Sequence, residues 1–187
     1  MAFTIFWRLV FTKINMAKKI LLIIAFEGFQ PKEYSDPKNI LKNAGVEVLT
    51  ASNKMGTAVS AYLNLPVNVD LSLDDVVVKD YSGIFLIGGP GALECLDNEK
   101  VYKIMTQAKE NGLGWGAICI STRILAKANL LQNKQATGWN GDGELPLILK
   151  NAGAIYQEEN VVVDDKLITA VGPNSASDFG QAILENL

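Results

Sequence analysis

The stretch Gly114-Trp-Gly-Ala-Ile-Cys-Ile-Ser-Thr122 places Cys119 at the junction of two predicted elements. The apolar run at 115–118 is typical of a short buried strand, and residues 122–128 carry apolar side chains at helical spacing. A sharp turn here lifts the cysteine out of a sheet, and the helix N-terminus behind it favours a thiolate. Small residues on either side, Ala117 and Ser121, allow that turn. Cys119 is therefore a candidate nucleophile in an elbow, and the alternative is a small buried hydrophobe.

Strands and helices alternate on both sides of this elbow. Continuous apolar runs predict buried strands at 20–26, 46–51 and 84–87. Helices are predicted at 34–43 and 99–111, and a glycine follows each of them. Tight strand, helix, strand connections favour a parallel sheet with right-handed crossovers. We therefore expect residues 16–187 to form one doubly wound α/β domain.

The other segments are less regular. Residues 27–33 are predicted as a loop, and 54–80 as an inserted ribbon or edge feature with a short strand at 67–71. A weak strand near 135–138 and a helix at 144–151 follow the elbow. The chain then predicts a hairpin of 161–163 with 167–171, and a terminal helix that Ser175 or Ser177 caps.

Composition excludes several classes of function. The chain has 187 residues, 49% of them hydrophobic, and a net charge of −3, so no broad basic surface for nucleic acid is implied. It has no histidine, which excludes Ser-His-Asp triads, Cys-His dyads and His-containing metal sites. Its two cysteines make no disulfide framework, which favours a reduced, cytoplasmic compartment. We expect no metal and no cofactor.

Residues 1–15 are apolar and basic, but charges interrupt the run well short of a membrane span. They lack a signal peptide's clean apolar centre and small-residue cleavage site. Met16-Ala-Lys-Lys19 reads as an ordinary start, so we interpret 1–15 as a disordered or loosely docked extension, or a misassigned start. The alternative is an amphipathic surface anchor.

Three segments are expected at the carboxyl ends of the strands, where open α/β sheets bind ligands. They are the loop 27–33, the glycine loop 88–91 and the Cys119 elbow. The backbone N–H groups of Gly89 and Ile120 are candidates for an oxyanion hole, although the glycines also suit a plain tight turn. Spacing does not choose between Glu27 and Glu33 as acidic partner. A protonated carboxyl would stabilise a thiolate, and an ionised one would oppose it.

The sequence resembles the ThiJ/PfpI family of the class I glutamine amidotransferase-like superfamily, which includes intracellular proteases and the Parkinson-associated deglycase. The motifs that carry the resemblance are Gly88-Gly-Pro-Gly91, Ala117-Ile-Cys-Ile-Ser121 and the ending 161–173 with 177–184. The family has a glutamate four residues before a proline and twelve before a glycine. Glu33, Pro37 and Gly45 match that spacing.

The resemblance implies a flavodoxin-like three-layer sandwich, a mostly parallel sheet with helices on both faces, and a homodimer. It implies Cys119 as nucleophile and readily oxidised thiol, with Glu33 as its partner and Gly89 and Ile120 as backbone donors. Gly88, Ser121 and Trp139 are expected to line the pocket. The chain departs from the family at two places. Protease-like members have a histidine directly after the cysteine, where this chain has Ile120. Other members have a histidine in the strand after the elbow helix, where this chain has Thr137-Gly138-Trp139.

Four functions follow from these residues. The first is attack of Cys119 on small reactive carbonyls such as methylglyoxal, or on their protein adducts, with Glu33 moving the proton. The second is a stress sensor in which Cys119 is oxidised reversibly. The third, an intracellular peptidase or amidase, is disfavoured because histidine is absent. The fourth is a chaperone-like dimer without turnover. Cys95 is interpreted as a structural thiol at the start of a helix after the glycine loop, and the alternative is a resolving role with Cys119. Neither a nucleic acid nor a membrane is expected as a partner.

Overall fold

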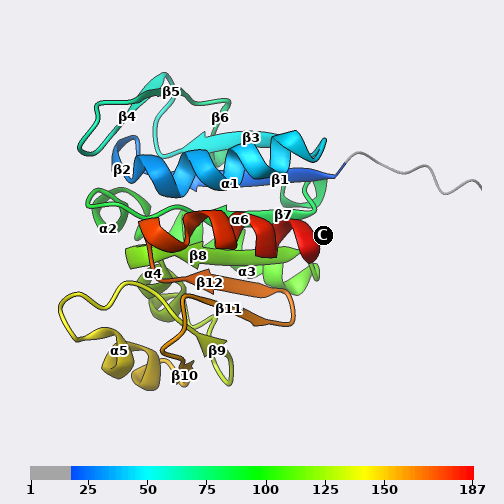
Figure 1. Ribbon diagram of the computed structural model, residues 1–187. Coiled ribbons are helices and arrows are strands. Elements are labelled where there is room, and N and C mark those ends of the chain that lie inside the picture. The colour runs from blue at the N-terminus through cyan, green and yellow to red at the C-terminus, as the bar shows by residue number, and fades with distance from the viewer. Residues whose placement is uncertain (1–17) are drawn as a thin grey trace, which may run out of the picture.

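The computed structural model describes residues 18–187 (Figure 1). Its main sheet has the strand order β11-β12-β8-β7-β1-β3-β6, and every neighbouring pair is parallel except β11 with β12. These strands are β1 (Lys19–Ile24), β3 (Glu47–Ser52), β6 (Leu71–Ser72), β7 (Gly83–Leu86), β8 (Gly114–Ile118), β11 (Val161–Asp164) and β12 (Leu167–Ala170). The strands predicted at 20–26, 46–51 and 84–87 lie side by side at the centre as β1, β3 and β7.

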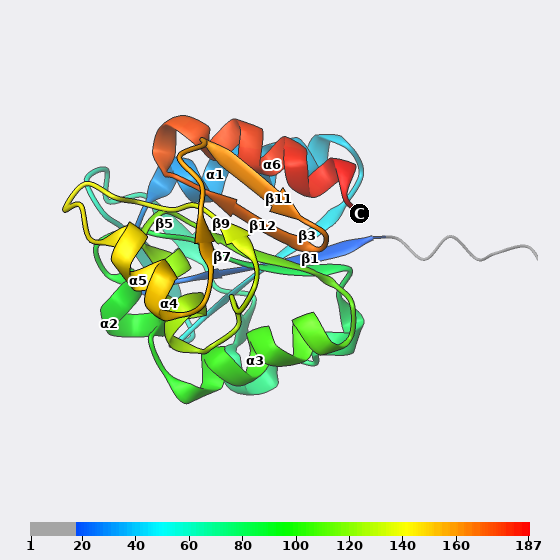
Figure 2. The ribbon, with the colours of Figure 1, turned by 90° about the horizontal axis from the view of Figure 1, so that it is seen from below.

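Both faces of the sheet are covered. Successive side chains of a strand point to opposite faces, so Leu21 and Ile23 of β1 enter one core and Ile20, Leu22 and Ile24 the other. Two helices, α1 (Pro31–Asn43) and α6 (Ala176–Glu185), pack together on one face. On the opposite face lie α3 (Glu99–Glu110) and α4 (Thr122–Lys127), as Figure 2 shows from below. The predicted flavodoxin-like, three-layer α/β sandwich is confirmed.

Smaller elements surround this sheet. A three-stranded ribbon joins β2 (Glu27–Phe29), β4 (Thr57–Ser60) and β5 (Pro66–Asn68), and in Figure 1 β4 and β5 lie above β3. Past the elbow, β9 (Gln135–Ala136) pairs with β10 (Ile155–Tyr156), and α5 (Leu145–Asn151) lies between them in sequence. A short helix, α2 (Ala92–Leu96), follows the glycine loop and carries Cys95.

Three local predictions differ from the structure. The strand expected at 67–71 is divided between β5 and β6, which belong to different sheets. The loop expected at 27–33 contains β2, and α1 begins at Pro31 because the Gln30 side chain accepts hydrogen bonds from the N–H groups of Lys32 and Glu33. At the terminal helix, neither serine caps with its side chain. Ser175 holds the N-cap position without a side-chain hydrogen bond, and Ser177 instead donates to Asp36.

The extension expected at 1–15 and the start expected at Met16 lie outside the described residues. Within 18–187, no helix is both long enough and apolar enough to cross a membrane.

Candidate active site

Cys119 occupies a strained backbone position at the carboxyl end of β8. Its φ is +65°, in the left-handed region that a side chain makes costly by about 1–3 kcal/mol. The turn is held from two sides: Ser121 Oγ donates to the Ile87 carbonyl (2.9 Å), and the Trp139 amide donates to the Cys119 carbonyl (3.1 Å). A short 3₁₀ turn at Cys119–Ser121 then leads into α4. The elbow predicted from the sequence is present, with the thiol 8% exposed.

Glu33 projects from α1 and is fully buried. Its Oε2 accepts a hydrogen bond from the Gly88 amide (3.0 Å), whereas Oε1 has no hydrogen-bond partner of ordinary geometry among the described residues. A Cβ atom built on Gly88 would lie 2.6 Å from Glu33 Oε2 and 2.6 Å from Cys119 Cβ. The carboxyl and the thiol therefore meet across Gly88, which has no side chain to separate them.

The two groups shift each other's pKa. Burial raises the pKa of Glu33 from 4.5 to about 7, against smaller lowering effects of the thiol and the Gly88 amide. Burial and the neighbouring Glu33 carboxylate raise the pKa of the Cys119 thiol to about 12. Since two adjacent buried groups do not both ionise, the pair carries at most one negative charge near pH 7. Because the Glu33 carboxyl has the lower pKa, that charge lies first on Glu33 while the thiol keeps its proton, and transfer of the thiol proton to Glu33 moves the charge to the sulfur.

Two backbone amides favour the charge on sulfur. The N–H groups of Ile120 and Gly89 lie near the sulfur and lower the pKa of the Cys119 thiol, against the larger effects of burial and Glu33. Gly89 has φ +119°, and a Cβ on it would lie 2.4 Å from the Gly28 carbonyl oxygen, so only glycine fits. The two amides that the sequence proposed as an oxyanion hole therefore converge on the thiol itself.

A hollow of about 430 Å³ opens above the thiol, and we call it the Cys119 hollow. Glu33, Gly89, Ile120 and Trp139 line it together with Cys119. Gly88 and Ser121, which were expected to line it, do not. Gly88 packs against Glu33 and Cys119 and does not line the hollow. Ser121 is fully buried, and its hydroxyl donates to the Ile87 carbonyl.

Sequence reasoning missed five lining residues: Gln30, Tyr62, Pro90, Leu93 and Pro173. Pro90 belongs to a quoted motif, and Pro173 directly follows Gly172 at the end of β12, so the strand-end rule could have found both. Tyr62 comes from the connection between β4 and β5, and no local pattern brings that segment to the hollow.

The other candidates lie apart from the pair. Glu27 is exposed and lies 3.8 Å from the Lys54 ammonium, so the structure favours Glu33 as the acidic partner. Cys95 is half-buried on α2 and borders a separate cavity of about 90 Å³ together with Glu27 and Lys54.

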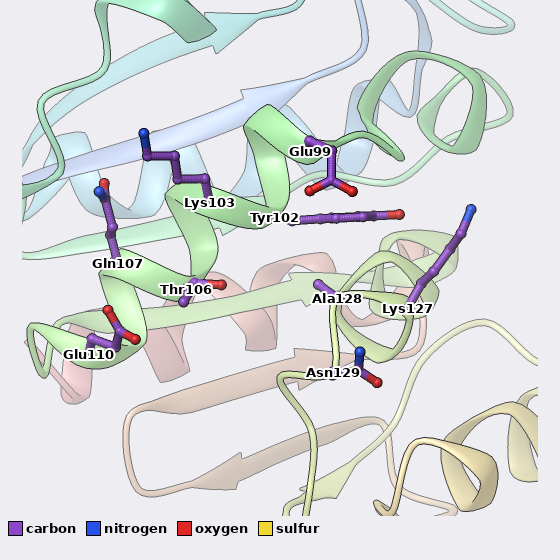
Figure 3. Close-up of a pocket in the computed structure, with 9 residues that line it drawn as sticks. All are labelled: Glu99, Tyr102, Lys103, Thr106, Gln107, Glu110, Lys127, Ala128 and Asn129. Carbon is purple, nitrogen blue, oxygen red and sulfur yellow. The ribbon is translucent and has the colours of Figure 1, made fainter.

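A second hollow, of about 530 Å³, lies between α3 and the end of α4 (Figure 3). Its lining is polar and mixed in charge, and one of its two lysines is already paired: Lys127 Nζ donates to Asp97 at 2.6 Å, and the Tyr102 hydroxyl donates to the same carboxylate. It contains no thiol, so it lacks the chemistry of the Cys119 hollow although it is larger. Among residues 18–187, no group of three or more His, Cys, Asp or Glu side chains is placed to hold a metal ion.

A family model described as the DJ-1/PfpI family matches residues 18–186 of this chain. The chain belongs to this family. The match covers the elbow, the glycine loop and Glu33 together, and the family includes cysteine-dependent enzymes.

Individual relatives agree with this membership. An uncharacterised protein of Methanocaldococcus jannaschii is 33% identical over 89% of this chain and 81% of its own. The fold is similar to a ThiJ/PfpI domain protein from Brachyspira murdochii, with a TM-score of 0.85 and 26% identity over 91% of this chain and 96% of that one. It is also similar to a solved structure described as oxidized DJ-1 of Toxoplasma gondii, with a TM-score of 0.79 and 26% identity over 90% of each chain.

Proposed function

We propose that this protein is a Glu33-assisted cysteine enzyme that acts on small reactive carbonyls or their protein adducts, in the manner of a glyoxalase or deglycase. The observation that supports this most is the buried carboxyl and thiol meeting across Gly88. Such a pair provides a nucleophile and a proton carrier without histidine.

The reaction with a 2-oxoaldehyde has three steps. The sulfur of Cys119 adds to the aldehyde carbon while the Glu33 proton moves to the aldehyde oxygen, which gives a hemithioacetal. The Glu33 carboxylate then removes the hydrogen from that carbon and returns it to the neighbouring one, while the hydroxyl proton moves to the neighbouring oxygen. Water finally hydrolyses the resulting thioester, releases a 2-hydroxy acid and restores the pair. The net change is addition of one water, and nothing is oxidised overall.

The enzyme's own residues divide these tasks. With its pKa near 7, Glu33 accepts and donates protons at neutral pH with little energetic penalty in either direction. The amides of Gly89 and Ile120 stabilise the negative charge on the sulfur, because both lower the pKa of the Cys119 thiol.

Incubation with methylglyoxal tests this proposal. We expect the parent to form lactate stoichiometrically with substrate loss, and Cys119→Ser to reduce the rate to background, because a hydroxyl is a far weaker nucleophile at neutral pH. Cys95→Ser is the matched control, since its thiol borders a different cavity, and it should retain the parent rate. Absence of lactate from the parent, or equal rates in parent and Cys119→Ser, contradicts the proposal.

Oxidation sensing is the second candidate, favoured by the fixed amides around the sulfur and by the relative that is described as oxidized. We expect mild peroxide to add oxygen to Cys119 at least about tenfold faster than to Cys95, because Glu33 can take the thiol proton during attack and the amides of Gly89 and Ile120 favour the resulting thiolate. Peptide mass spectrometry of a time course measures both rates in one sample. Equal oxidation of the two thiols would remove this candidate. The expected homodimer, chaperone-like role and cytoplasmic location stay predictions.

A further inference from the structure

The walls of the Cys119 hollow are almost entirely apolar. Apart from Gln30 and the Glu33–Cys119 pair, its larger side chains belong to Tyr62, Pro90, Leu93, Ile120, Trp139 and Pro173. None of the described residues that line it is lysine or arginine. A hollow of about 430 Å³ is within the range that holds drug-sized ligands, and it far exceeds the needs of a three-carbon substrate.

Trp139 is a fixed part of that wall. Its amide donates to the Cys119 carbonyl at 3.1 Å, which attaches the wall to the nucleophile's own backbone. Its indole lies against Gly141, where a Cβ would come within 2.6 Å of the ring, and the Arg123 guanidinium is 5.3 Å from the ring centroid. Gly141 and Arg123 therefore restrain the indole, which stays 37% exposed where it lines the hollow.

The nearby arginine does not offer its charge to the hollow. Arg123 Nη2 donates to both carboxylate oxygens of Asp142, at 2.6 and 2.8 Å, and Nη1 lies 3.6 Å from Glu144. The charged group that lines the hollow is the Glu33–Cys119 pair, which carries at most one negative charge, so an anionic ligand meets that charge and no cation among the lining residues.

We propose that the Cys119 hollow selects neutral carbonyl compounds with a bulky apolar or aromatic substituent, which packs on Trp139 and Leu93, over small or anionic ones. This selectivity rests on the proposed function for its biological use, but the binding preference itself does not need turnover. Burial of a ring against these walls should favour an aromatic reagent by about 10- to 100-fold over a small one.

Alkylation of Cys119 measures the preference without any enzymatic step. The probes are N-phenyliodoacetamide, iodoacetamide and iodoacetate, each of which forms a sulfur–carbon bond and releases iodide. Rates at Cys119, followed by mass spectrometry and divided by those of a free thiol in solution, should rank the aromatic probe first, at least tenfold above iodoacetamide, and the anion last. Equal normalised rates, or iodoacetate fastest, would overturn the proposal.

Variants locate the preference. Trp139→Ala and Leu93→Ala should each reduce the advantage of the aromatic probe about tenfold, whereas Leu147→Ala, an exposed apolar residue of α5 outside the hollow, should leave it unchanged. In parallel, phenylglyoxal, methylglyoxal and glyoxylate are tested as substrates. Selective alkylation without turnover of any of the three would support the apolar selection and contradict the proposed catalysis. Turnover together with equal alkylation rates would support the proposed catalysis and contradict the apolar selection.

Discussion

Glu33→Gln is expected to stabilise the fold above pH 7 by about 3 kcal/mol. Burial raises the pKa of Glu33 from 4.5 to about 7, so the folded state binds this proton more tightly than the unfolded state. Below pH 4.5 both states are protonated and burial of the carboxyl costs no ionisation energy. As the pH rises from 4.5 to beyond 7, the fold must accept a buried charge and loses that stability. Glutamine has no such charge at any pH.

Chemical denaturation of parent and Glu33→Gln at pH 4.5, 6 and 8 measures this difference. The gap should be small at pH 4.5 and near 3 kcal/mol at pH 8. Glu27→Gln is the matched control, because it removes the same charge from an exposed side chain and should show no pH-dependent gap. A pH-independent difference between parent and Glu33→Gln would contradict the burial argument.

The same substitution is expected to lower turnover by about 10²- to 10⁴-fold, because an amide does not carry the proton. This one substitution would then raise the free energy of unfolding above pH 7 and lower the rate of turnover. The test is to measure kcat with methylglyoxal for the parent and for Glu33→Gln, in parallel with the denaturation series. An active Glu33→Gln would require another proton carrier, and none of the other described residues that line the hollow is a carboxylic acid.

Gly88→Ala is expected to disrupt the site from within. The new methyl group would lie 2.6 Å from Glu33 Oε2 and from Cys119 Cβ, and 2.9 Å from the Ile118 carbonyl oxygen. None of these atoms retreats easily, because the first two belong to buried side chains and the third to the backbone of β8. We expect a stability loss of about 1–3 kcal/mol from overpacking and a turnover loss of at least about 100-fold from displacement of the pair.

Gly172→Ala provides the comparison. Its methyl group would face the same two residues at ordinary contact distances, 3.7 Å from Glu33 Oε1 and 3.9 Å from Cys119 Sγ, on an extended backbone. Its effect on the free energy of unfolding should stay within about 1 kcal/mol. If Gly88→Ala matches Gly172→Ala in free energy of unfolding and in turnover, then the arrangement of Glu33 and Cys119 does not depend on their close approach across Gly88.

The sequence predicted the central strands, the elbow and the two-sided core because the apolar runs are long and tightly connected. The acidic partner was harder. Local pattern did not separate Glu27 from Glu33, and the family spacing with Pro37 and Gly45 pointed to Glu33. In the structure the Gln30 cap starts α1 at Pro31, and Glu33 lies in the first turn of that helix, fully buried. Tyr62 could not be placed at all, since a long-range ribbon brings it to the hollow. Local patterns carry no information on such contacts.

The hydrogen bond from the Trp139 amide to the Cys119 carbonyl has a consequence for how this protein can diversify. Because the Trp139 backbone is hydrogen-bonded to the Cys119 backbone, a change that moves Trp139 also disturbs the position of Cys119. Leu93 and Tyr62 belong to other segments of the chain. New ligand preferences should therefore arise first at those two positions, in laboratory evolution as among natural descendants of this sequence.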